Sequence, residues 1–159
     1  MTIAVPVRWT GTALDTRVPL QATLDAVGAA EHGSCFLCGS SNPMGIKLAF
    51  EAESEGSVVT RVCFSELYAG YPGVLHGGLV SALLDAAMTN ALFSKGVVAV
   101  TAELTVRFLA PVSPSRHALV RGSVVNREHH RLYAVSAELE QDGKCRARAT
   151  AKFLPRARE

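Results

Sequence analysis

The sequence predicts an α+β protein in which an antiparallel sheet packs against one long, apolar helix. The helix is predicted because residues 79–93 contain neither glycine nor proline and are apolar on nearly every side. The sheet is predicted because stretches before and after this helix alternate apolar and polar residues, as half-buried strands do. A chain of 159 residues is long enough for one such domain with a single core.

The chain divides into an N-terminal arm, residues 1–34, and a main domain, residues 35–159. Spacing of apolar residues predicts a short helix inside the arm, and alternation predicts two strands ahead of the long helix. The Glu55-Gly56 pair indicates the hairpin turn between these strands. The predicted elements are the short helix at 20–30, strands at 46–50 and 58–64, and a loop at 68–75.

Four strands are expected after the long helix, at residues 100–108, 119–127, 132–140 and 145–154. Asp142-Gly143 is a strong signal for a two-residue hairpin turn between the last two strands. In the first strand, alternation places Thr101 on one face. The opposite face is predicted to carry Val100, Ala102, Leu104, Val106 and Phe108.

Composition and charge argue against several classes of partner. The formal net charge is only +2, with 16 basic and 14 acidic residues, so nothing predicts binding to nucleic acid or to a membrane. The N-terminus lacks the pattern of a signal peptide, and four cysteines in a chain of this length do not resemble a disulfide framework. We therefore expect a cytoplasmic protein with reduced thiols.

Asp85 is the most informative residue of the long helix. Ser81, Asp85 and Thr89 recur every four residues and form one polar stripe on an otherwise apolar helix. A buried carboxylate without a partner costs several kcal/mol, so a buried Asp85 is unlikely to be there by chance. The alternative is a stripe that faces solvent or bonds to its neighbours. We interpret Asp85 as a functional carboxylate.

His76, Gly77 and Gly78 lie where the long helix should begin. Two glycines at a helix start let a ligand approach the backbone, and the free N–H groups there bind developing negative charge. The alternative is a plain turn with glycine chosen for packing. For His76 we favour a supporting role in this turn over a part in the chemistry.

The spacing along the helix predicts a homodimer. Gly78 and Asp85 are seven residues apart, so a rise of about 1.5 Å per residue separates them by roughly 10 Å along the axis. A reacting carbon needs both a carboxylate, or its water, and the helix N–H groups within about 3–3.5 Å. Two antiparallel copies can supply both, which predicts two shared sites per dimer. The sequence leaves pairing of dimers into a tetramer open.

The segment from Tyr71 to Asp85, Tyr-Pro-Gly-Val-Leu-His-Gly-Gly-Leu-Val-Ser-Ala-Leu-Leu-Asp, resembles the signature of PaaI-type acyl-CoA thioesterases. The upstream segments Cys35-Phe-Leu-Cys-Gly and Asn42-Pro-Met-Gly resemble one branch of that group. The resemblance covers about residues 35–154 and implies the hotdog fold, in which an antiparallel sheet wraps around a central helix. It also implies hydrolysis of acyl-CoA to free acid and CoA, without cofactor or metal.

By this resemblance, Asp85 matches the catalytic carboxylate, which activates water or attacks the thioester directly. Gly78 and its neighbours match the helix start that polarises the thioester carbonyl, and Thr101 matches a hydroxyl that helps to place the water. Some relatives carry an asparagine at the position of Gly70, and this chain lacks that donor. The rival interpretations are a non-catalytic acyl-CoA-binding protein and a hotdog hydratase or dehydratase, although Tyr71 stands where a dehydratase histidine is expected.

Two groups of residues are candidates for substrate contacts. Leu75 and Leu79 are expected to line the acyl group. Arg127, His130 and Arg131 lie in a basic cluster at a predicted turn, which is either a solvated hairpin tip or a contact for the CoA phosphates.

His32, Cys35 and Cys38 share the spacing of a zinc knuckle. No second pair of ligands is evident in the sequence, and no predicted helix follows Cys38 to lower a thiol pKa for redox chemistry. We therefore expect ordinary buried thiols and no metal.

Overall fold

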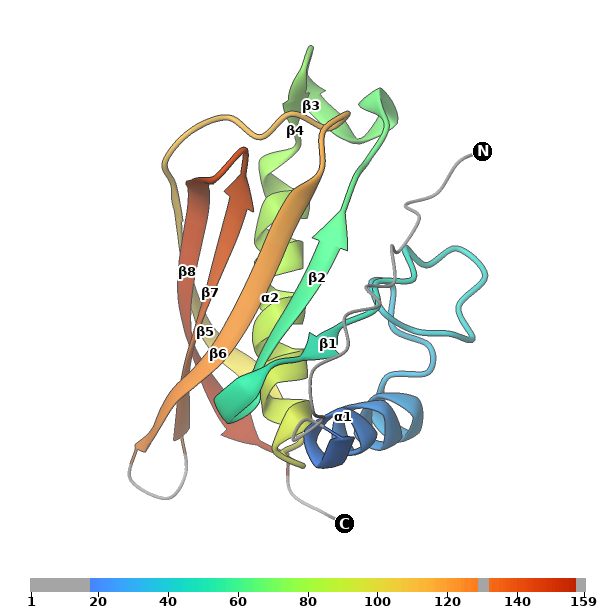
Figure 1. The fold of residues 1–159 in the computed structure, drawn as a ribbon, viewed down its shortest axis with the longest axis vertical. Coiled ribbons are helices and arrows are strands. Elements are labelled where there is room, and N and C mark those ends of the chain that lie inside the picture. The colour runs from blue at the N-terminus through green and yellow to red at the C-terminus, as the bar shows by residue number, and fades with distance from the viewer. Residues whose placement is uncertain (1–17, 129–131, 157–159) are drawn as a thin grey trace.

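The computed structural model describes residues 18–128 and 132–156 and contains one antiparallel sheet that wraps around a long helix (Figure 1). The helix α2 covers Gly77–Ser94, and a shorter helix α1 covers Val18–Glu31. The six strands of the sheet lie in the order β1-β2-β6-β7-β8-β5. Their bounds are β1 Glu51–Ala52, β2 Ser57–Val62, β5 Ala99–Phe108, β6 Ala118–Glu128, β7 Leu132–Gln141 and β8 Lys144–Pro155. This arrangement is the predicted hotdog fold, which is confirmed.

Helix α2 forms the centre of the core. Apolar residues on several sides of it are inaccessible to solvent, because the sheet covers one side and α1 packs on another. The most deeply buried are Leu83, Leu84, Met88 and Leu92. Lys95 ends the helix, and Gly96 follows with a φ of 71°, which favours glycine. Within the described residues, no helix is both long and apolar enough to cross a membrane.

Gly122 is the point of closest approach between the sheet and α2. A Cβ placed on Gly122 would overlap the carbonyl group of Ala87 and lie 3.0 Å from the Met88 nitrogen. Both obstacles are helix backbone, so neither can rotate away. The absence of a side chain at Gly122 therefore sets the distance between β6 and the helix.

We expect Gly122→Ala to lower the free energy of unfolding by about 1–3 kcal/mol or more, because the helix must move outward to make room. Chemical denaturation followed by circular dichroism measures this loss. Gly28→Ala is the matched control, since that glycine lies in α1 with nothing near its missing Cβ. The control should be neutral or slightly stabilising, and an equal loss in both variants would contradict the close approach.

The predicted strand at residues 46–50 is wrong, because none of these residues belongs to a strand. Only Glu51 and Ala52 pair with β2. Upstream of them the backbone bonds to a different segment: Ile46 N–H donates to Phe36 O at 2.9 Å and Leu48 N–H donates to Leu37 O at 2.8 Å. The loop that carries the two cysteines thus takes the hydrogen bonds that a neighbouring strand would have used.

Residues 68–75, predicted as a loop, contain a small hairpin. Its strands are β3 (Ala69–Tyr71) and β4 (Val74–Leu75), and Pro72-Gly73 forms the turn with a φ of 72° at Gly73. Two short 3₁₀ turns, Ser54–Gly56 and Glu66–Tyr68, flank β2. The hairpin lies directly before α2 (Figure 1), so it controls how the chain enters the helix.

Strand β5 lies at one edge of the sheet and contains a bulge that sequence alternation did not predict. Thr101 pairs with Phe153 and Glu103 pairs with Lys152, so Ala102 is the extra residue. After a bulge the side chains change faces. Thr101 therefore faces the helix, on the same side as Leu104, Val106 and Phe108, and the predicted assignment of Thr101 to the opposite face is wrong.

Candidate active site

The N-terminus of α2 is capped by His76. Its ring Nδ1 accepts a hydrogen bond from Gly78 N–H at 2.9 Å, and its backbone N–H donates to Tyr68 O at 2.9 Å. Leu79 and Val80 N–H both donate to His76 O. Among the described residues, this leaves Gly77 N–H as the first helix donor without an acceptor. The turn therefore presents one open N–H, at Gly77 rather than Gly78.

Gly70 lies against the capping histidine. A Cβ at this position would sit 3.2 Å from His76 Cδ2 and 3.3 Å from His76 Cα. The small residue lets the β3–β4 hairpin and the His76 turn pack closely. Glycine at this position contributes no side-chain donor to the helix start.

Asp85 and Thr101 meet across the gap between α2 and β5. The Thr101 hydroxyl donates to Asp85 Oδ1 at 2.7 Å. This contact depends on the β5 bulge, which turns Thr101 toward the helix. Asp85 is half-buried and Thr101 is exposed in the single chain, so the expectation of a buried Asp85 is not met here. The bond fixes one carboxylate oxygen and leaves the other available.

Within the described residues, two pockets adjoin the N-terminus of α2. One pocket of about 680 Å³ is lined by residues that include Leu75, His76, Gly77 and Phe108. A second, of about 400 Å³, is lined by residues that include His76, Gly78, Leu79 and Phe36. Neither contains Asp85 or Thr101. Gly77 and Asp85 are eight residues apart on α2, so a rise of about 1.5 Å per residue separates the two candidate parts by about 12 Å along the axis.

Apolar side chains are exposed along β5 and the residue after it. The exposed fractions are 54% for Val100, 37% for Leu104, 56% for Phe108 and 45% for Leu109. On its outer edge β5 pairs with no other strand of the described chain, because it is the last strand in the order. An open strand edge with apolar neighbours is a typical surface for pairing with a second chain.

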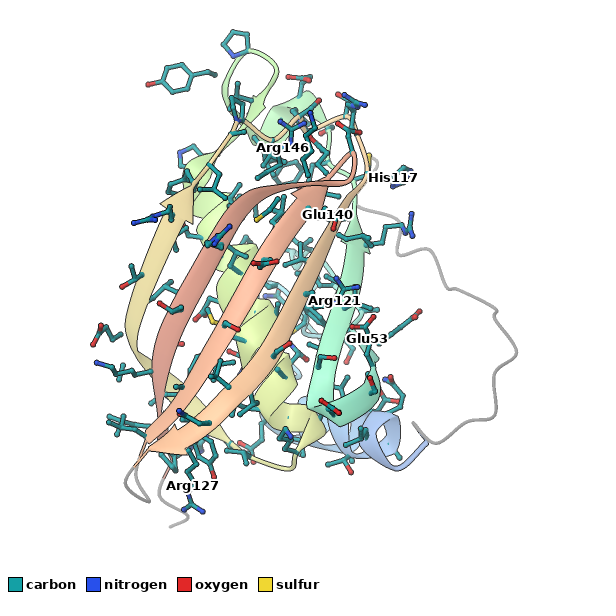
Figure 2. All side chains as sticks on the ribbon, turned by 60° about the vertical axis from the view of Figure 1, so that its left-hand side comes forward. Glu53, His117, Arg121, Arg127, Glu140 and Arg146 are labelled. Atoms are coloured by element: carbon teal, nitrogen blue, oxygen red, sulfur yellow. The ribbon has the colours of Figure 1, made fainter. Side chains whose placement is uncertain are left out.

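Arg127 lies far from the helix N-terminus of its own chain. It stands near the end of β6, at the opposite end of the sheet from the segment that leads into α2 (Figure 2), and its guanidinium stacks 5.4 Å from the centre of the Tyr133 ring. His130 and Arg131 lie outside the described residues. Within the described residues, Arg127 therefore does not approach the His76 turn of its own chain.

Phe36 is a pocket residue that the sequence analysis did not identify. It is 58% exposed and comes from the loop between Cys35 and Cys38, more than thirty residues before the helix start that it faces. No local pattern indicates this proximity, because it depends on how the cysteine loop packs on α2.

The model of the thioesterase superfamily matches residues 72–144, which include the His76 turn, Asp85 and Thr101. No curated protein matches the sequence significantly.

Several solved structures are similar. A thioesterase superfamily protein has 25% identity and a TM-score of 0.69 over 74% of this chain, but the match spans only 61% of that longer protein. PaaI from the phenylacetic acid degradation operon of Escherichia coli has 18% identity and a TM-score of 0.72, covering 89% of this chain and 96% of its own. A hypothetical thioesterase protein of Streptococcus pneumoniae, solved with coenzyme A, has 18% identity and a TM-score of 0.64 over 70% of this chain and 90% of its own.

The fold and the helix-start motif thus define a hotdog-fold protein. Its resemblance to the thioesterase superfamily, and among the solved structures to PaaI-type proteins, is confirmed.

Proposed function

We propose that this protein hydrolyses acyl-CoA thioesters to a free acid and CoA, at two sites shared between the protomers of a homodimer. The observation that carries the proposal is the Thr101–Asp85 hydrogen bond of 2.7 Å on an otherwise apolar helix. A carboxylate held in one orientation, with a second oxygen available, is suited to accept a proton from water.

In the proposed reaction, the Gly77 N–H of one protomer donates to the thioester carbonyl oxygen. Asp85 of the other protomer takes a proton from a water molecule while the oxygen of that water attacks the carbonyl carbon. The negative charge that develops on the carbonyl oxygen is stabilised by the helix N-terminus. The C–S bond then breaks, and the proton passes to the departing CoA sulfur. Thr101 keeps Asp85 oriented throughout.

Three observations support the shared site. The open Gly77 N–H and the Asp85 carboxylate are too far apart on one helix to reach the same carbon. The two pockets at the helix start lack Asp85. Finally, β5 offers an unpaired apolar edge next to Thr101 for the partner chain. We propose that Leu75 and Leu79, which line the pockets, contact the acyl group.

The Streptococcus pneumoniae protein supports the choice of substrate and residues. It was solved with coenzyme A. In one further structure of it alanine replaces an aspartate, and in another alanine replaces a threonine. Those two residues are separated along that chain by the same number of positions as Asp85 and Thr101 are here.

The proposal is tested with a panel of acyl-CoA esters of different chain length and with aryl esters, using a thiol reagent to follow release of CoA. Binding of each ester is measured in parallel by calorimetry. We expect turnover of at least one ester class. If esters bind but no thiol appears, the protein is a non-catalytic acyl-CoA-binding protein. Loss of the enoyl absorbance without thiol release would instead indicate a hydratase.

Arg127 remains a proposed contact for the CoA phosphates, at a site built with the partner chain. Arg127→Ala should raise KM for acyl-CoA several-fold with kcat nearly unchanged, because a phosphate contact far from the thioester acts on binding alone. The effect should shrink at high salt. Arg121→Ala is the matched control, because Arg121 lies on β6 like Arg127 but its guanidinium is already paired with Glu53 at 2.8 Å (Figure 2). An equal rise in KM for both variants would contradict a specific role for Arg127.

A further inference from the structure

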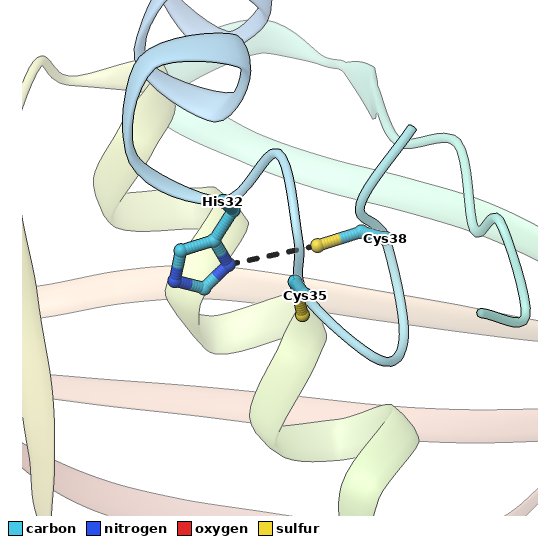
Figure 3. A group of neighbouring side chains, drawn as sticks. All are labelled: His32, Cys35 and Cys38. Atoms are coloured by element: carbon cyan, nitrogen blue, oxygen red, sulfur yellow. Dashed lines mark hydrogen bonds between the residues drawn. The ribbon is translucent and has the colours of Figure 1, made fainter. Parts of the chain in front are cut away.

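The loop that follows α1 brings three metal-binding side chains together. His32, Cys35 and Cys38 converge beside α2 (Figure 3), and their candidate ligand atoms all lie within 4.8 Å of one another. The Cys38 Sγ is 3.6 Å from His32 Nδ1. All three side chains are half-buried, so a small ion can reach them from solvent.

These separations fit a tetrahedral zinc site. Zinc bonds sulfur at about 2.3 Å and imidazole nitrogen at about 2.0–2.1 Å, so two of its tetrahedral ligands lie roughly 3.5–3.8 Å apart. The observed separation of 3.6 Å between nitrogen and sulfur falls in this range. The Cys35 Sγ lies within 4.8 Å of each of the other two ligand atoms, so a shift of about 1 Å would bring both of its separations into the same range.

The backbone of the loop is shaped around the first sulfur. Leu37 N–H donates to Cys35 Sγ at 3.4 Å, and an N–H aimed at sulfur favours the thiolate that a metal requires. The tight return of the chain depends on Gly39, where a Cβ would lie 2.6 Å from both Cys35 O and Gly33 O. Lys47 holds the far side of the loop by donating to the carbonyls of Gly39, Ser40 and Asn42.

The imidazole is also oriented in advance. The His32 ring packs edge-on against Phe93 of α2, with ring centres 4.8 Å apart.

The same features argue against a redox pair. A reactive Cys-x-x-Cys needs a thiolate stabilised by a helix that begins at the cysteines. Residues 39–50 contain no helix, so no helix begins at the cysteines.

We propose that His32, Cys35 and Cys38 bind one Zn²⁺ ion, with water as the fourth ligand. The sequence-based expectation of no metal rested on the lack of a second pair of ligands. The fold brings the ligand atoms of the three residues within 4.8 Å of one another, and water would take the fourth position. On binding, each cysteine releases its thiol proton to solvent and bonds zinc as a thiolate. The zinc stays divalent, so no oxidant or reductant is needed.

The ion would hold one wall of the candidate active site. Phe36 lies between the two cysteines and lines the pocket of about 400 Å³ with Gly78 and Leu79. Fixing Cys35 and Cys38 to one ion therefore fixes Phe36 over the helix start. This consequence rests on the proposed function: loss of zinc should change KM and acyl preference more than kcat.

The test uses full-length protein without a histidine tag, produced with zinc in the medium, desalted and analysed by elemental mass spectrometry. We expect about one zinc per chain in the wild type and less than about a tenth in the Cys35→Ser/Cys38→Ser variant. Cys63→Ser is the matched control, because Cys63 is an equally half-buried cysteine far along the chain, and it should keep its zinc.

A second measurement does not depend on variants that fold. Wild-type protein stripped by a chelator, and shown to be folded by circular dichroism, is titrated with Co²⁺. Tetrahedral thiolate coordination should produce strong visible absorption and a sulfur-to-cobalt band, and Zn²⁺ should abolish both.

Three results would overturn the proposal: folded wild type that takes up neither ion, a Cys35–Cys38 disulfide in freshly purified protein, or equal metal loss in Cys63→Ser. Metal binding is measured without substrate. A failure of acyl-CoA hydrolysis would therefore contradict the proposed function and leave the result on zinc unchanged.

Discussion

Replacing Asp85 with asparagine should lower kcat for the best acyl-CoA ester by about 10²–10⁴-fold, with little change in KM. Asparagine has the same shape, and its side-chain oxygen can still accept the Thr101 hydroxyl that now bonds Oδ1 at 2.7 Å. The amide cannot take a proton from water, so the variant removes the base and little else. Steady-state release of CoA measures the effect.

Thr89→Val is the matched control for Asp85→Asn. Thr89 belongs to the same polar stripe, one turn further along α2, and is 7% exposed. Valine keeps its shape, so any general disturbance of the helix should appear in this variant too. We expect turnover within a few-fold of wild type. If Asp85→Asn stays active while His76→Ala is inactive, the base has been assigned to the wrong residue.

Asp85 could be selected from the sequence because a carboxylate is costly inside an apolar helix. The long helix and the late strands could also be predicted, because the helix is an apolar run without glycine or proline and the strands alternate apolar and polar residues over many positions. The Asp142-Gly143 turn could be predicted in the same way, because Asp-Gly favours a two-residue hairpin turn. Both residues adopt the positive φ that such a turn requires, 57° and 69°. In each case the residues that carry the signal are neighbours in the sequence.

What the sequence could not show depends on contacts between distant segments. The stretch at 46–50 looks like a strand, and its actual backbone partner is the loop at Phe36 and Leu37. Alternation assigned Thr101 to the face opposite Leu104, Val106 and Phe108, because the pattern of apolar and polar residues gives no sign of the bulged residue Ala102. The bulge creates the contact with Asp85, so the candidate site depends on a feature that period-two reasoning misses.

The open donor at the helix start leads to the second large effect. Gly77→Pro should lower kcat by about 10²–10³-fold, because it deletes the N–H proposed to bind the oxyanion. Proline is well tolerated at the first residue of a helix. The preceding residue, His76, already has the extended ψ of 128° that a following proline requires. Gly77→Ala keeps the N–H and should stay active, since its Cβ would meet only Phe108 at 3.6 Å.

The two inactive variants together test whether the site is shared. If Gly77 of one protomer works with Asp85 of its partner, a heterodimer of Gly77→Pro and Asp85→Asn contains one site with both native residues. Random pairing of equal amounts makes half of the dimers heterodimers, so about a quarter of the wild-type sites should return. If both groups acted within one chain, mixing would restore nothing.

Exchange of subunits is achieved by co-expression with two different affinity tags and isolation of the doubly tagged species. The pure heterodimer should then show about half of the wild-type kcat per dimer, while each parent stays inactive. An inactive heterodimer, or an active wild type that sediments as a monomer of 16.9 kDa, would rule out the shared site. Restored turnover would show that each α2 helix contributes its N-terminus to one site and its carboxylate to the other.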